Sequence, residues 1–230
     1  MKHALWIPLA ALLVGTASLA GCGGLGSAYA PAMNASPTPA PSPSPSVSPT
    51  PTPTPIQLFV AGTIGTQQGW PDDDTAAGGK GQTIDGIPCK TELFNSFHHH
   101  VHVSVFVNGV QYWIPKGTGM SHPDPGNQGF IYHARCFYYL HTHDRTGIIH
   151  IEPADATVYT LKNWFDIWGQ PLSTSNVAGF TGSVSVYVNG MLQPGVDPNT
   201  VAFAPFEEIT LVIGTPPSWI PRYLFPPNYP

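Results

Sequence analysis

Hydrophobic and polar residues alternate along two segments of the chain, and each segment is interrupted by Asn-Gly. The first spans residues 101–115 ("VHVSVFVNGVQYWIP") and the second spans residues 182–195 ("GSVSVYVNGMLQPG"). Strict alternation is typical of a strand with one buried face. Asn-Gly favours a type I′ turn, because both central residues need a positive φ. The pattern therefore predicts two β-hairpins, and residues 207–214 ("EEITLVIG") predict another strand.

One segment has helical periodicity instead. Its large apolar residues recur three or four positions apart, at Leu161, Trp164, Phe165 and Trp168, and so share one helical face. Thr160 and Gly169 are of the residue types that commonly begin and end a helix. An amphipathic helix over 161–168 between hairpins predicts an α+β fold, mainly antiparallel β, in a β-grasp-like arrangement; a β-sandwich or a small barrel is the alternative. The proline-rich tail after residue 214 is expected to run in extended form outside any sheet.

The N-terminal part of the chain has a different composition. The opening "MKHALWIPLAALLVGTASLAGC" joins a basic residue to an apolar run and then small residues, which predicts a secretory signal peptide over 1–21. Its last four residues resemble the bacterial lipobox, in which the cysteine, here Cys22, is lipidated; an ordinary cleaved signal is the alternative. Residues 22–55 would then be the lipidated cysteine and a Pro/Ser/Thr-rich stalk, followed by a single histidine-rich domain over 56–230. We therefore expect an exported protein that a lipid anchor holds at a membrane of the cell envelope.

Charge and cysteine content narrow the possible partners. The chain has 13 acidic and 8 basic residues, without a cluster of Lys or Arg, so nucleic acid is not an expected partner. Apart from Cys22, the cysteines are Cys89 and Cys136. In an exported protein such a pair predicts a disulfide; a thiolate metal ligand is the alternative.

Histidines are concentrated in "YYLHTHDRTGIIHIE", residues 138–152. A type I turn over 144–147 would place His141 opposite His150, and would put His143 and Glu152 on the same face, because alternate residues of a strand point to the same side. Opposed Cβ atoms are about 4.5–5.5 Å apart, so these side chains could share one ion. Asp144 could cap the turn or could orient a histidine through a hydrogen bond.

A second strand repeats this arrangement. In "FHHHVHVSVFV" the even-numbered residues 98–106 share one face, and the valines at odd-numbered positions share the other. His100 and His102 are therefore further candidate ligands. We expect His99, His122 and His133 to be structural.

Imidazole is the commonest metal-binding side chain. Three histidines with an open position are typical of catalytic zinc, two histidines and a carboxylate suit non-haem iron, and tetragonal N/O ligands suit copper. We therefore expect a transition-metal site for Zn, Cu or Fe. One alternative is a metal-dependent hydrolase or lyase with Glu152 as base; another is a structural or adhesion domain whose histidines are solvated. Residues 72–74 ("DDD") could bind calcium, but they lack the spacing of a calcium loop and are expected to be a solvated loop.

Several motifs resemble those of a group of exported bacterial proteins and lipoproteins without known activity. The resemblance covers residues 86–227 and rests on "HHHVHVSVFVNG", "CFYYLHTHDRTGIIHIEP", "TLKNWFDIWGQPLS" and "VYVNG". It implies export and a histidine-rich domain, and it implies no particular reaction.

Overall fold

Two Asn-Gly turns shape the main sheet, as predicted. Asn108 and Gly109 have φ values of 48° and 81°, and Asn189 and Gly190 have values of 52° and 78°. Positive φ at both central positions is the signature of a type I′ turn. Val107 pairs with Val110 across the first turn, so the predicted hairpin is confirmed, and the second is confirmed in the same way.

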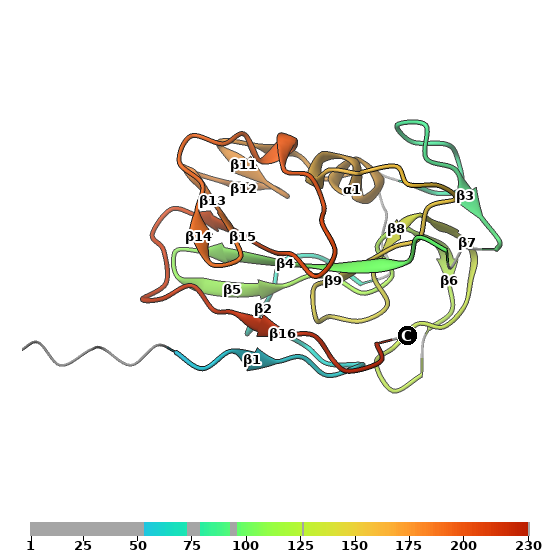
Figure 1. Ribbon diagram of the computed structural model, residues 1–230, viewed down its shortest axis with the longest axis horizontal. Coiled ribbons are helices and arrows are strands. Elements are labelled where there is room, and N and C mark those ends of the chain that lie inside the picture. Colours follow the sequence, from blue (N-terminus) through green and yellow to red (C-terminus); the bar gives the residue numbers. More distant parts are fainter. Residues whose placement is uncertain (1–52, 73–78, 93–95, 126, 230) are drawn as a thin grey trace, which may run out of the picture. The chain divides into compact units, whose positions relative to one another are not determined.

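A computed structural model describes residues 53–72, 79–92, 96–125 and 127–229 (Figure 1). They belong to a unit that begins at Thr50. The expected signal peptide, Cys22 and nearly all of the expected stalk lie outside the described residues. No helix within the described ranges combines the length and apolar character that a membrane crossing needs.

In the described part of the chain the elements follow this order: β1 (Ile56–Gln57), β2 (Gln67–Gln68), β3 (Cys89–Lys90), β4 (His99–Val107), β5 (Val110–Trp113), β6 (Met120–Pro123), β7 (Ala134–Tyr138), β8 (Leu140–His141), β9 (Ile148–Ile151), α1 (Leu161–Trp168), β10 (Leu172–Ser173), β11 (Asn176–Val177), β12 (Phe180–Thr181), β13 (Val184–Val188), β14 (Met191–Leu192), the 3-10 helix η1 (Pro198–Thr200), β15 (Glu208–Ile213) and β16 (Tyr223–Leu224).

The largest sheet has the strand order β14-β13-β15-β4-β5-β2, and β9 pairs with both β4 and β8. Its ladders are antiparallel except for β4–β15 and β2–β5, which are parallel. In the central order β5-β4-β15-β13, the parallel strands β4 and β15 lie in the middle. β4 also pairs with β5 in the first hairpin, and β15 also pairs with β13 of the second hairpin. Helix α1 lies between the two hairpins in sequence. This agrees with the expected mainly antiparallel α+β fold and its β-grasp-like arrangement, and the described strands do not close into a barrel.

The long strand β4 organises both the core and the candidate site. One of its edges pairs with β15, and its other edge pairs first with β9 and then with β5. Val101, Val103 and Val105 are at most 1% exposed and pack in the core together with the helix residues Trp164 and Phe165. The opposite face of β4 therefore carries the histidines.

Helix α1 starts and ends where the sequence predicts. The backbone N–H of Thr160 donates to Asn163 Oδ1 at 2.9 Å, so one of the amides at the helix start is satisfied. Gly169 adopts φ 71° and donates its N–H to the Asp166 carbonyl at 3.1 Å. A left-handed glycine is a common helix end because it lacks Cβ strain.

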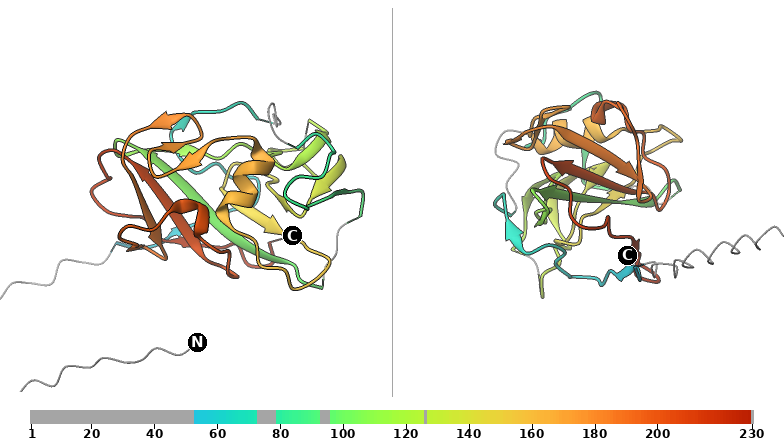
Figure 2. Two further views of the ribbon diagram at one scale, coloured as in Figure 1. Left: turned by 90° about the horizontal axis from the view of Figure 1, so that it is seen from above. Right: turned by 90° about the vertical axis from the view of Figure 1, so that its left-hand side faces the viewer.

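The histidine face of the sheet is covered by β1, β16 and the residues around them. Leu58, Ile148 and Tyr223 form a second small core there. Figure 1 shows α1 on one side of β4 and β9, and β1 with β16 on the other; the right-hand view in Figure 2 shows the same three layers. The tail was expected to lie outside any sheet, but β16 pairs with β1. Its prolines do not prevent this, because the amides of Ile56 and Leu58 donate to carbonyls in the tail.

A separate small sheet has the order β3-β7-β6. Cys89 on β3 and Cys136 on β7 form the predicted disulfide, with a Cα–Cα distance of 5.4 Å. Both sulfurs are therefore engaged with each other, and the thiolate-ligand alternative does not fit the structure. The disulfide links β7 to β3, and β7 leads along the chain into β8, the strand that carries His141.

Candidate metal centre

Three histidines form a line across three neighbouring strands. His150 on β9 is opposite His141 on β8 and opposite His100 on β4. The β8–β9 register is the predicted one, and it continues to Glu152, whose N–H donates to the Tyr139 carbonyl at 2.9 Å. Because directly opposed residues point to the same side of a sheet, all three imidazoles project from one face.

The connection between β8 and β9 is an irregular loop where a type I turn was expected. Its residues pair with other parts of the chain: Arg145 forms a bridge with Thr63. Asp144 is buried, and its carboxylate accepts hydrogen bonds from the N–H groups of Thr146 (3.0 Å) and Ala61 (2.9 Å) and from the Tyr229 hydroxyl (3.0 Å). Asp144 therefore stabilises the loop, which was one of its two expected roles, and among the described residues it has no hydrogen bond to a histidine.

Two further histidines complete the cluster: His98 directly before β4, and His143 two residues after the end of β8. The ligand nitrogens form two sets, each with all nitrogens within 4.8 Å of one another. The inner group is His141, His143 and His150, and the outer group is His98, His100 and His150. His141 is 0% and His150 is 1% exposed, so these imidazoles are not solvated.

Backbone carbonyls determine the tautomers of the inner group. His141 Nδ1 lies 2.9 Å from the Tyr138 carbonyl oxygen, and His143 Nδ1 lies 2.5 Å from that of Ile131. A carbonyl oxygen only accepts hydrogen bonds, so each Nδ1 carries the proton and each Nε2 presents a lone pair. The two Nε2 atoms are 3.0 Å apart. Metal-binding histidines commonly donate their second N–H to a carbonyl in this way.

The outer group includes a carboxylate. Glu152 Oε1 lies 3.2 Å from His98 Nε2 and 3.3 Å from His150 Nδ1. His98 Nε2 also lies 3.0 Å from His100 Nε2 and 3.2 Å from His150 Nδ1. Four potential ligand atoms therefore converge on one small volume.

Burial keeps the imidazoles neutral. It is the largest cause that lowers the pKa of His143, to about 4. The pKa values of His141 and His150 are lowered well below the ordinary value, first by burial and then by the neighbouring imidazoles. A neutral imidazole is the form that binds a metal.

Burial has the opposite effect on Glu152. It raises the pKa of this carboxyl from 4.5 to about 7, because a low-polarity environment disfavours the charged form. A cation beside Glu152 would reverse this effect.

His102 was predicted as a ligand together with His100, but the structure does not bring it to either group. Its Nε2 donates to the Thr146 carbonyl at 2.8 Å, and its ring packs on Tyr223 with centroids 4.1 Å apart. Burial lowers its pKa to about 4. His102 is thus a buried residue beneath the tail.

The remaining candidates lie elsewhere. His99 Nδ1 donates to the Phe97 carbonyl at 3.0 Å, and both His122 and His133 are exposed. Asp72 accepts two hydrogen bonds of 3.0 Å from Arg145 Nε, so this carboxylate is paired with a cation; residues 73 and 74 lie outside the described residues.

The sequence did not identify Tyr229 as part of the site, and His98 was noted only for its face of the strand. The Tyr229 ring centroid lies 5.2 Å from those of both His100 and His150. Phe130 stacks on His143 at 4.6 Å. His98 could have been included from its alternation with His100, whereas the two aromatic contacts depend on how distant segments fold over the sheet.

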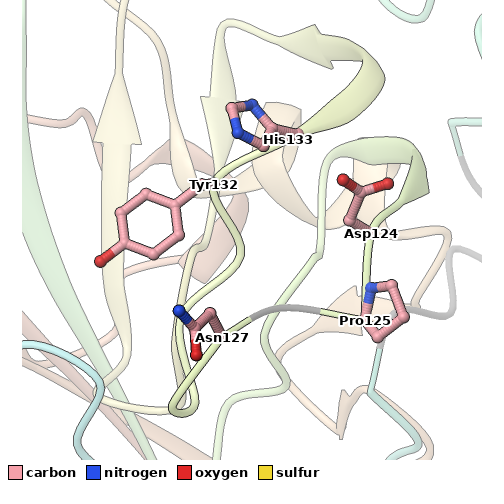
Figure 3. Close-up of a pocket in the computed structure, with 5 residues that line it drawn as sticks. All are labelled: Asp124, Pro125, Asn127, Tyr132 and His133. Carbon is pink, nitrogen blue, oxygen red and sulfur yellow. The ribbon is translucent and has the colours of Figure 1, made fainter.

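One pocket adjoins the cluster. It has a volume of about 330 Å³ and is lined by residues that include His98, His99, Pro153 and Val158. Another, of about 420 Å³, is formed by Asp124, Pro125, Asn127, Tyr132 and His133 (Figure 3). The second pocket shares no residue with the inner or outer group.

Comparison of the chain with protein-family models, curated proteins and solved structures found no match. The chemistry of the site therefore has to be inferred from its own geometry.

Proposed function

We propose that this protein binds a transition-metal ion, copper, zinc or iron, through the inner group. The observation that carries the proposal is the pair of Nε2 lone pairs of His141 and His143, which face each other at 3.0 Å. Two nitrogens bound to one zinc at about 2.0–2.1 Å are about 3.3 Å apart at a tetrahedral angle. His150 supplies the third nitrogen.

A cation is needed between these lone pairs, because two acceptors at hydrogen-bond distance repel each other. A proton could serve, but burial of His143 lowers its pKa to about 4, so protonation is unfavourable near neutral pH. A metal ion supplies the charge without protonating a ring. Imidazole nitrogen favours Zn, Cu, Fe or Ni over Mg or Ca.

Export and membrane anchoring are part of the same proposal. The signal-like N-terminus, the lipobox-like sequence before Cys22 and the Pro/Ser/Thr-rich stretch support it. The Cys89–Cys136 disulfide is consistent with an oxidising compartment. The protein would then present its metal site from a membrane of the cell envelope, with a lipid anchor as its membrane contact.

Metal content of the untagged full chain tests the proposal. Elemental analysis after exposure to Zn(II) and desalting should find bound zinc in the wild type and in His133→Gln, a control in an exposed loop. The inner-pair variant, His141→Ala/His143→Ala, should lose the zinc ion of the inner group. Full zinc content in a folded inner-pair variant would overturn the proposal, and so would a wild type that binds none.

A second candidate function is metal-assisted hydrolysis with Glu152 as general base. The observation that favours it is the position of Glu152, whose Oε1 lies 3.3 Å from Nδ1 of the inner-group residue His150, since a general base must lie beside the group from which it takes a proton. Zinc-loaded protein would then hydrolyse p-nitrophenyl acetate, and Glu152→Gln would lose this activity but retain the zinc ion of the inner group. Equal rates in both proteins would reject Glu152 as base.

A further inference from the structure

His150 belongs to both the inner and the outer group, because its strand lies between the strands that carry the other histidines. It is on β9, the middle strand of three, with His141 opposite on one side and His100 opposite on the other. The outer and inner groups thus lie on the two sides of a single imidazole. Its ring stacks at 20° to that of His141 and lies at 88° to that of His100.

The two nitrogens of His150 have different surroundings. Nδ1 lies beside His98 Nε2 (3.2 Å) and Glu152 Oε1 (3.3 Å). Nε2 is buried and has no hydrogen-bond partner among the described residues. A buried ring nitrogen without a partner is costly unless something binds it. The two ring nitrogens of an imidazole point in diverging directions, so one ring cannot bind a single ion through both nitrogens.

The outer group has the geometry of a complete site. His98 Nε2 lies 3.0 Å from His100 Nε2, 3.2 Å from His150 Nδ1 and 3.2 Å from Glu152 Oε1. His150 Nδ1 lies 3.3 Å from Glu152 Oε1. Ligand atoms that surround one zinc tetrahedrally at about 2.0–2.1 Å are about 3.3 Å apart. All four distances are close to this value.

We propose that the protein holds a second metal ion in the outer group, between His98, His100 and Glu152, and that His150 bridges the two ions through both ring nitrogens. The inference rests on the proposed function of the inner group and extends it from one ion to a two-ion centre.

The proton balance of the bridge is simple. With one ion on Nε2, neutral His150 keeps its proton on Nδ1, where it can be donated to Glu152 Oε1. When the second ion binds Nδ1, this proton leaves to solvent, the ring becomes an imidazolate, and Glu152 binds the ion as a carboxylate. No electron is transferred.

The two ions would differ in access. The side chain of His98 is 22% exposed and lines the pocket of about 330 Å³, which also includes exposed Val158. His141 is fully buried. The outer ion is therefore the one that an incoming ligand or a chelator reaches first, while the inner ion holds the bridge.

Stoichiometry tests the second site. The untagged full chain, titrated with Zn(II) and analysed for bound metal, should hold two ions. His98→Ala should hold one, in the inner group, and His143→Ala should hold one, in the outer group, while His133→Gln keeps two. A wild type that binds one ion, lost in His143→Ala but kept in His98→Ala, would overturn the second site and leave the proposed function standing. Binding of no metal would reject both.

Copper tests the bridge. Two Cu(II) ions joined by an imidazolate couple their spins, so the integrated EPR signal of doubly loaded wild type should fall well below two spins per chain at low temperature. His98→Ala with one Cu(II) should give one full spin, and it provides the reference for an uncoupled ion. A wild-type signal of two independent spins would overturn the bridge.

Discussion

Acidification of the metal-free protein should destabilise it strongly, because several buried imidazoles would have to stay neutral. In the unfolded chain a histidine has a pKa of about 6.5, whereas burial lowers the pKa of His102 and His143 to about 4 in the folded protein. The unfolded state therefore binds more protons between about pH 4 and pH 6.5, and the free energy of unfolding falls as the pH falls.

The magnitude follows from the same shifts. At pH 5, relative to pH 8, His102 and His143 would each lower the free energy of unfolding by about 2 kcal/mol. Burial also lowers the pKa values of His141 and His150, so both residues add to this loss. Glu152 acts in the opposite direction, because its folded-state pKa is raised to about 7, and it would recover about 2–3 kcal/mol. His102 and His143 alone outweigh Glu152 by about 1–2 kcal/mol. His141 and His150 increase the net loss, which is then a large fraction of the stability of a small domain.

Guanidinium unfolding of EDTA-treated protein at pH 8 and pH 5, followed by tryptophan fluorescence, measures this loss. His102→Phe removes one buried imidazole outside both groups, so its loss between the two pH values should be smaller by about 2 kcal/mol. His133→Gln, in an exposed loop, should behave like the wild type. Equal or greater stability of the wild type at pH 5 would show that the buried imidazoles do not resist protonation in the folded protein.

Three other predictions concern the supports of the site. Zn(II) at about 100 times its Kd should stabilise the wild type by about 2.7 kcal/mol for each ion bound, which raises Tm by roughly 5–11 °C per ion; the inner-pair variant should lose the part of this shift that comes from the inner ion, and an undiminished shift there would place that zinc elsewhere. Gly119→Ala should lower both stability and zinc affinity, because a Cβ would lie 2.1 Å from the Leu140 carbonyl oxygen at β8; Gly179→Ala, also at positive φ but with open space around it, should cost only about 1–3 kcal/mol, and equal losses in the two variants would contradict this. Cys89→Ser/Cys136→Ser should lower the free energy of unfolding by about 4 kcal/mol for a sequence separation of 47 residues with zinc stoichiometry unchanged; lost zinc in a folded variant would revive a cysteine ligand.

Sequence patterns predicted those parts of the fold that residues close together along the chain determine. The two Asn-Gly turns, the caps of α1 and the β8–β9 register all follow from residues close together in sequence. The parallel pairing of β4 with β15 joins segments about a hundred residues apart, and nothing in either strand specifies that partner. The tail's return to pair with β1 is of the same kind.

The site was predictable to a similar degree. Alternation placed His100 and His150 on faces that turn out to be shared, but the ladder between β4 and β9, which brings these two residues opposite each other, is non-local. The same alternation put His102 with His100, whereas the structure turns His102 toward Thr146 and Tyr223. Which residues of a correctly predicted face meet one another depends on neighbours that sequence periodicity does not reveal.

Whether the inner group holds a metal ion can be observed by anomalous diffraction from crystals of the zinc-loaded protein, recorded on both sides of the zinc absorption edge. We expect a zinc peak about 2.0–2.1 Å from the Nε2 atoms of His141 and His143, with a nitrogen of His150 as the third ligand. A peak bound only by other residues, or well-ordered inner-group histidines with no peak between them, would contradict this expectation.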